Sequence, residues 1–185
     1  MAEVPKSYAL HTWCCLVWWS FYSREYEYLR VRQMTLEIDG LAKTVLSASR
    51  KGLLRKRSIF KLHAATSSDE LRELEEEIGI PLPNDFRSWL LALGYGDIDE
   101  ELSFRREWFA GIESGQLKGG ARFAQDILGN FYAFDSTGRI FYLSRSQPVF
   151  AAISKGFSDF IDELVRRDYK LVNWMNTLET QRYEW

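Results

Sequence analysis

The sequence is poor in cysteine and histidine, which build most metal sites and nucleophilic catalytic centres. Its two cysteines are adjacent, at Cys14 and Cys15, and its only histidines are His11 and His63. Neighbouring cysteines rarely bond to each other, because such a disulfide is strained. A disulfide framework, a zinc site and a nucleophile–histidine pair are therefore all disfavoured. We expect no metal, no cofactor and no enzymatic activity, and a reducing, cytoplasmic compartment.

The sequence also lacks an apolar run long enough to cross a membrane. Its most apolar stretch, residues 9–22, is about 14 residues long, whereas a span needs roughly 20. Only Lys6 supplies positive charge before this stretch, and no small-residue cleavage site follows it, which argues against a signal peptide. We interpret residues 1–33 as an N-terminal extension, either a start site placed too early or a poorly packed segment. Residues 34–185 are expected to form one domain.

Charge is unevenly distributed, although the formal net charge is only −2. Residues 66–113 carry 13 acidic and four basic residues, a balance of −9, whereas residues 50–61 carry six basic residues and no acid. The small net charge argues against stable nucleic-acid binding. The basic run fits a solvated loop or an edge element, and nucleic-acid binding through it is a weaker hypothesis. The acidic block is either a solvated face or a surface that attracts a basic partner.

Local patterns predict several helices. Apolar residues are spaced helically within residues 36–54. Ser67 and Glu70 have the spacing of a capping box, and Gly79 suits the end of the helix that follows. A further helix is predicted to begin near Pro83, whose missing N–H is not needed in a first turn, and to stop at Gly94. Residues 154–178 are predicted to be helical, with one apolar stripe formed by Phe157, Phe160, Ile161 and Leu164.

Strands are predicted nearer the C-terminus. Residues 131–134 and 140–143 are runs of aromatic and branched residues, separated by a turn in which Gly138 can adopt positive φ. This pattern predicts a β-hairpin, and residues 149–153 are expected to add a short strand. Residues 95–120 are expected to be rich in loops. The order of elements predicts an α+β domain, with a mainly antiparallel sheet flanked by helices.

Three segments resemble the SUKH superfamily, which includes fungal cell-wall-assembly regulators of the Smi/Knr type and many bacterial immunity proteins. They are "LEEEIGIPLPNDFRSWL", "GNFYAFDSTGRIFYL" and "ISKGFSDFIDELV". Residues 34–185 are thus identified as a SUKH-like domain, with the best match over about residues 66–165. Many members place an Asn-Gly pair after the second of these helices, where this chain has "GYGDIDEE". The resemblance implies that Gly129 and Asn130 are mainly architectural.

The resemblance also implies a non-enzymatic protein-binding module. The leading hypothesis is an immunity protein that neutralises a cognate toxin by direct binding, and a basic nuclease is the toxin that best fits the charge pattern. The alternative is a regulatory scaffold of the cell-wall-assembly regulator type. Neither hypothesis requires a membrane, and the oligomeric state is left open.

The candidate partner-binding residues fall into two groups. Acids could steer a basic partner, and aromatic anchors could supply affinity at the centre of an interface. Trp108 and Phe109 fit a core position equally well. The candidate acids are Glu76, Asp97, Asp99, Glu100, Glu101 and Asp126, and the candidate anchors are Tyr95, Trp108 and Phe109.

Overall fold

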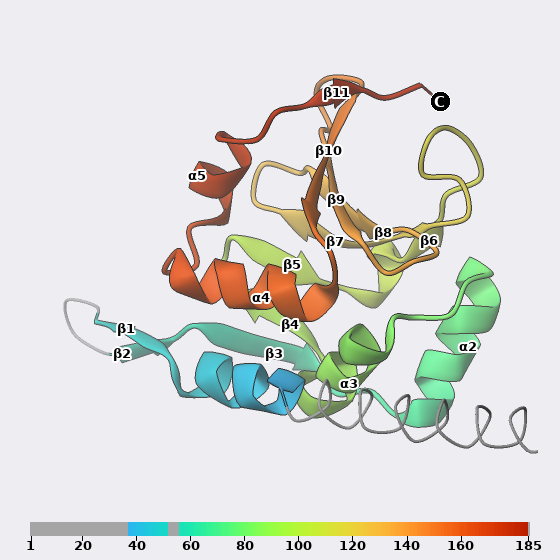
Figure 1. Cartoon of the computed structure of the whole chain (residues 1–185). Coiled ribbons are helices and arrows are strands. Elements are labelled where there is room, and N and C mark those ends of the chain that lie inside the picture. Colours follow the sequence, from blue (N-terminus) through green and yellow to red (C-terminus); the bar gives the residue numbers. More distant parts are fainter. Residues whose placement is uncertain (1–36, 52–55, 185) are drawn as a thin grey trace, which may run out of the picture. The chain divides into compact units, whose positions relative to one another are not determined.

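A nine-stranded antiparallel sheet is the framework of the domain (Figure 1). The computed structural model describes residues 37–51 and 56–184, so the expectation for residues 1–33 lies outside the described residues. From one edge to the other the strands are β3 (Phe60–Ala64), β4 (Tyr95–Ile98), β5 (Leu102–Phe104), β7 (Ala121–Asp126), β8 (Phe131–Phe134), β9 (Ile140–Leu143), β10 (Val149–Ser154) and β11 (Gln181–Arg182). The short strand β6 (Ala110–Gly111) also pairs with β7, and β1 (Ser49–Lys51) pairs with β2 (Lys56–Ser58) in a separate ribbon.

The predicted hairpin is confirmed, with strands at the expected residues. Phe134 pairs with Ile140 at the closed end, and Phe131 pairs with Leu143 at the open end. The turn between them is held by the Asp135 carboxylate, which accepts the backbone N–H groups of Thr137 and Arg139 at 2.9 and 3.0 Å. Gly138 has a φ of 84°, which a residue with a side chain rarely adopts. The turn chemistry therefore sets the register of this part of the sheet.

Helices cover one face of the sheet. The first described helix spans residues 37–47, and α2 (Ser68–Ile78), α3 (Asn84–Leu93), α4 (Phe157–Arg166) and α5 (Leu171–Met175) follow. The predicted capping box is present, because the Ser67 hydroxyl accepts the Glu70 N–H while the Glu70 carboxylate accepts the Ser67 N–H. Gly79 ends α2 with a φ of 73°. Strong local signals were therefore sufficient to place α2 and the start of α3.

Two predictions of helices were wrong in extent, and several short strands were missed. The helix predicted over residues 36–54 ends at residue 47, and β1 begins at Ser49. Residues 95–120 are rich in loops, as expected, but they also contain the short strands β4, β5 and β6, which were not predicted. The C-terminal helix is divided into α4 and α5 by Asp168 and Tyr169, which have φ values of 52° and 60°.

Phe86 of α3 is the centre of the main core. Its fully buried ring lies 4.4 Å from the ring of Phe157 and 4.8 Å from that of Phe123, centroid to centroid. Phe157 belongs to α4 and Phe123 to β7, so one side chain joins two helices to the sheet. A smaller apolar cluster lies apart from this core and contains Leu117, Ala133, Phe141, Leu143, Phe150 and Tyr183.

We predict that Phe86→Ala lowers the free energy of unfolding by about 3–5 kcal/mol, because it leaves a cavity where several rings meet. Leu91→Ala on the same helix is the matched control, since Leu91 is 43% exposed. Its effect should stay below about 1 kcal/mol. Urea denaturation followed by tryptophan fluorescence measures both variants. Equal effects of the two substitutions would contradict the central position of Phe86.

Candidate interaction surface

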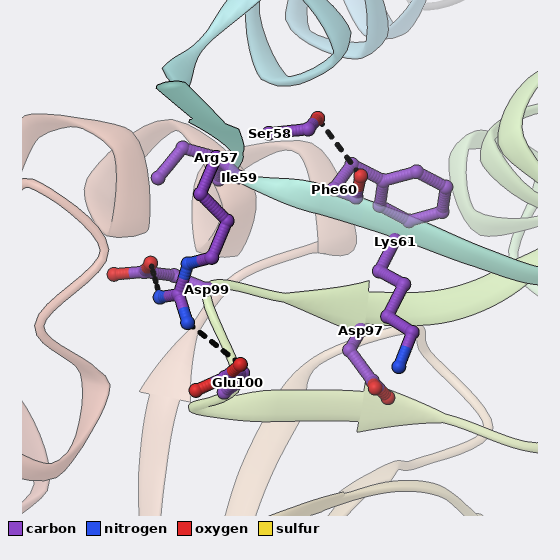
Figure 2. Close-up of a pocket in the computed structure, with 8 residues that line it drawn as sticks. All are labelled: Arg57, Ser58, Ile59, Phe60, Lys61, Asp97, Asp99 and Glu100. Atoms are coloured by element: carbon purple, nitrogen blue, oxygen red, sulfur yellow. Dashed lines mark hydrogen bonds and ion pairs between the residues drawn. The ribbon is translucent and has the colours of Figure 1, made fainter. Parts of the chain in front are cut away.

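A small pocket lies between the edge strand β3 and the turn that joins β4 to β5 (Figure 2). It has a volume of about 190 Å³ and is lined by Arg57, Ser58, Ile59, Phe60, Lys61, Asp97, Asp99 and Glu100. Ligand pockets are usually about 300–1,000 Å³, so this one is small for a cofactor. Both acidic and basic side chains line it. Its basic residues, Arg57 and Lys61, belong to the basic run of residues 50–61. The acidic and basic blocks thus meet here.

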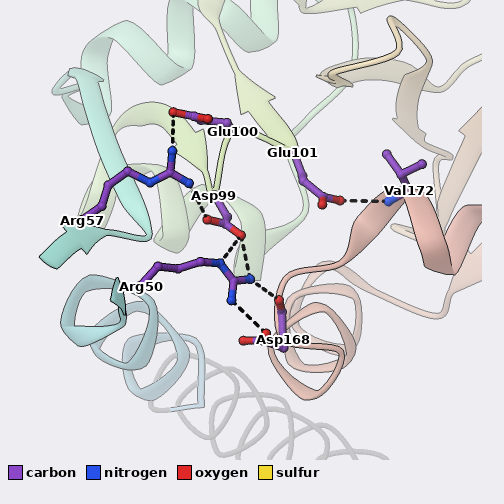
Figure 3. A network of polar contacts seen from close by, with 7 residues as sticks. All are labelled: Arg50, Arg57, Asp99, Glu100, Glu101, Asp168 and Val172. Carbon is purple, nitrogen blue, oxygen red and sulfur yellow. Dashed lines mark hydrogen bonds and ion pairs between the residues drawn. The ribbon is translucent and has the colours of Figure 1, made fainter. Parts of the chain in front are cut away.

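Asp99 lies where the two blocks meet. Its side chain is only 4% exposed, and its carboxylate forms ion pairs with Arg50 at 2.7 Å and with Arg57 at 3.0 Å (Figure 3). Arg50 also binds Asp168, beyond the end of α4, at 2.8 Å. Hydrogen bonds to Asp168 and Asp99 raise the pKa of the Arg50 guanidinium, so this cation is permanently charged. Asp99 is therefore part of the internal structure, which corrects its expected place on a partner-binding surface.

The turn that carries Asp99 has an unusual backbone. Asp99 and Glu100 both have positive φ, at 48° and 63°, and Glu101 N–H donates to Ile98 C=O at 3.0 Å. Hairpin turns of this kind favour glycine or asparagine, because a side chain at positive φ costs about 1 kcal/mol per residue. The two ion pairs of the buried Asp99 carboxylate offset that strain. They also explain why the sequence could use acidic residues where a glycine is more common.

The other acids of this segment are also engaged within the chain. Asp97 pairs with His63 Nε2 at 2.7 Å and accepts a hydrogen bond from Ser103 Oγ. Glu100 pairs with Arg57 at 2.6 Å. Glu101 accepts the Val172 N–H, at the start of α5, at 3.0 Å. The fold does bring these carboxylates together, but it uses them internally, so a freely available acidic loop is not observed.

The same contacts weaken the hypothesis of nucleic-acid binding. Arg50 and Arg57 belong to the basic run of residues 50–61, and both are held by carboxylates of this chain. A phosphate would have to displace these carboxylates to reach either guanidinium.

Asp126 is buried and organises the turn between β7 and β8. Its carboxylate accepts the backbone N–H groups of Leu128 and Asn130, the Asn130 side-chain amide, and the Tyr132 hydroxyl, at 2.9–3.1 Å. Burial, followed by the nearby Asp126 charge, raises the pKa of Tyr132 well above its ordinary value, so the phenol stays a donor. Asp126 is thus a structural acid rather than a surface one, which corrects its predicted place.

Gly129 and Asn130 complete this turn. Gly129 has a φ of 84°, and the Asn130 side-chain oxygen accepts the Arg145 N–H at 3.1 Å, across from β9. Both residues therefore fix backbone geometry, in agreement with the architectural role that the resemblance implies.

Two of the three candidate anchors lie in the core. Tyr95 and Phe109 are only 6% and 5% exposed, and their rings pack edge to face at 5.9 Å. Phe109 also stacks on Phe86. The expectation that they lie at the surface is corrected by this burial. Trp108 is half-buried, with the Arg105 guanidinium 5.3 Å above its ring, and it alone of the three candidates retains partial access to solvent.

The outer face of α2 carries two acids that make no ion pair within the described chain. Glu76 is exposed, and so is Glu73, one helical turn away. Neither makes a hydrogen bond or an ion pair with any residue that the structure describes. Their neighbours differ, because Glu75 binds Arg87 at 2.7 Å and Glu77 binds Arg106. Glu73 was not among the predicted residues, although its spacing of three from Glu76 was a usable signal.

Comparison with known proteins agrees with this architecture. The family model described as the SMI1 / KNR4 family (SUKH-1) matches residues 65–163, more than half of the chain. The matched region begins just before α2 and ends within α4. No curated protein and no solved structure matches the sequence. Among the described residues, no helix is both long enough and apolar enough to span a membrane.

We predict that Asp99→Asn lowers the free energy of unfolding by about 2–4 kcal/mol, because two arginines lose the charge that balances them. Glu100→Gln is the matched control in the same turn, where the Glu100 side chain is 67% exposed. It should leave the unfolding midpoint unchanged, as expected for an exposed ion pair. Chemical denaturation compares the two variants. A loss of stability that is the same for both would refute the structural role of Asp99.

Proposed function

Since the chain belongs to the SMI1 / KNR4 family (SUKH-1), we propose that it is a protein-binding module that acts without catalysing a reaction. Within that class we propose an immunity protein that neutralises a cognate bacterial toxin in the cytoplasm by direct binding. The observation that supports this proposal best is the acidic outer face of α2. The side chains of its two exposed glutamates, Glu73 and Glu76, form no hydrogen bond or ion pair in the described part of the chain.

Helix stability does not explain these acids. The C-terminal end of a helix carries a partial negative charge, so acids in the last turns disfavour the helix by a few tenths of a kcal/mol each. Glu75, Glu76 and Glu77 occupy this end of α2, and its last turn contains no basic residue. Glu75 and Glu77 are compensated by arginines. For Glu76 and Glu73, attraction of an external basic surface is the role that fits their position.

A candidate anchor lies on the segment next to this face. The short 3-10 helix Arg106–Trp108 is joined to α2 by the ion pair between Arg106 and Glu77. Trp108 belongs to the same turn and is half-buried. Tryptophan is enriched among the residues that dominate binding energies, whereas long-range charges act mainly on association rates. A basic partner would therefore be steered by the α2 acids and held at Trp108.

Co-expression tests the proposal directly. The chain is produced together with the product of the neighbouring gene, and cell growth and co-purification are measured. If that product is toxic, we expect the chain to restore growth and to purify with it. A toxic product that is neither neutralised nor bound would contradict the proposed immunity. Binding of a non-toxic component of cell-envelope assembly would instead support the regulatory alternative.

We predict that the double substitution Glu73→Lys and Glu76→Lys slows association with the toxin at least about tenfold at low salt, with a smaller effect at high salt. The double substitution Glu179→Lys and Glu184→Lys makes the same change of net charge at exposed residues elsewhere. It should slow association less than about threefold. Stopped-flow kinetics measures both. If both double variants slow association equally, the α2 acids do not steer the partner. That result would not contradict neutralisation by direct binding.

A further inference from the structure

A second and larger pocket lies over the smaller apolar cluster. It has a volume of about 400 Å³, within the range of ligand pockets. Its apolar surface comes from Ile112, Phe131, Leu143 and Tyr183. Phe131 and Leu143 are paired residues of β8 and β9, so the floor is part of the sheet itself. A rigid floor of this kind is suited to receive an apolar side chain.

The wall of the pocket is fixed by contacts between distant segments. The Tyr183 hydroxyl donates to Ser114 C=O at 2.9 Å, and the Gln116 side chain accepts the Glu184 N–H at 2.9 Å. These bonds join the loop after β6 to the residues that follow β11. The pocket is therefore formed before any ligand arrives, which reduces the entropy cost of binding.

Two arginines of the lining, Arg122 and Arg145, are free of ion pairs. Neither guanidinium pairs with a carboxylate in residues 37–51 and 56–184, and the lining contains a single acid, Glu113. Most arginines of the described chain do pair with a carboxylate: Arg50, Arg57, Arg72, Arg87, Arg106, Arg139, Arg166 and Arg167. The pocket thus has a local excess of positive charge in a protein whose net charge is negative.

Both arginines are held in place by the sheet. The Arg122 guanidinium lies 4.8 Å from the centre of the Phe131 ring, a distance typical of cation–π contacts. The Arg145 side chain lies against Gly129, where a Cβ would approach its Nη1 to 2.9 Å. Asn130 fixes the Arg145 backbone. The Gly-Asn pair therefore does more than shape a turn, because it provides the space and the anchor point for this arginine.

We propose that this pocket binds a peptide segment of a partner protein in which an apolar side chain stands next to carboxylates. The apolar side chain fills the space above Phe131 and Leu143, and the carboxylates pair with Arg122 and Arg145. Arginine binds carboxylates through two parallel hydrogen bonds, so the pair of guanidinium groups selects charge and orientation together. The mixed apolar and cationic lining, with Glu113 beside it, fits such a peptide better than a phosphate chain. No residue of α2 lines the pocket, so the inference does not rest on the toxin interface proposed above.

Fluorescence anisotropy with two labelled synthetic peptides tests the inference. One peptide is Gly-Glu-Asp-Trp-Glu-Leu-Asp-Gly, and the other replaces every acid by its amide. We expect the acidic peptide to bind at least about tenfold more tightly than its amide counterpart. Arg122→Gln and Arg145→Gln should each weaken its binding at least about fivefold, and Arg145→Lys should weaken it less because the charge is kept. Arg72→Gln on α2, which does not line the pocket, should change it less than about twofold.

Several results would overturn the inference. They are equal affinity for the two peptides, no saturable binding of the acidic peptide, or unchanged binding by both glutamine variants. Tighter binding of a single-stranded oligonucleotide through Arg122 and Arg145 would reassign the pocket to nucleic acid. Melting temperatures of all variants confirm that the fold is kept. The α2 double variant should bind the acidic peptide as the unmodified protein does, which separates this site from the proposed toxin interface.

Discussion

The buried carboxylate of Asp99 is the interaction on which the arrangement of charge in this protein depends. It draws Arg50 of β1 and Arg57 of β2 onto the turn between β4 and β5, and Arg50 extends the network to Asp168 beyond α4. A carboxylate taken out of water is costly unless cations and hydrogen bonds replace its hydration. Two guanidinium groups provide that replacement. One acid thus holds together the β1–β2 ribbon, the turn between β4 and β5, and the segment after α4. Its ion pairs also neutralise part of the acidic and basic blocks seen in the sequence.

Cancellation of charge explains why composition was a poor guide to the surface. A count of acids over residues 66–113 treats Asp99, Asp126 and Glu76 alike, yet the first two are buried and the third is exposed. Which acid stays available is decided by cations that lie far away in sequence, such as Arg50 for Asp99. The aromatic residues follow the same rule, since Tyr95 and Phe109 face the core while Trp108 partly faces solvent. No local pattern distinguishes these cases.

Features whose causes are local were predictable from sequence. The capping box of Ser67 and Glu70, the turn held by Asp135 and the apolar stripe of α4 all depend on residues within a few positions of one another. The strands β4, β5 and β6 were missed because they are two to four residues long and are defined by their partners in the sheet. The family resemblance, built on three local segments, is confirmed by the match over residues 65–163. It identifies the fold and leaves the binding surfaces to be determined by tertiary contacts.

The two borders of the described sheet are shaped so that it does not extend from one molecule to the next. At one border, β3 is interrupted by a bulge between Leu62 and Ala64 and carries the charged Lys61. At the other, β11 is only two residues long. Irregular, charged or very short border strands are poor templates for added strands, and proteins use them to avoid stacking side by side. Helix faces and pockets, where side chains determine which partner fits, are therefore better suited to recognition than the borders of the sheet.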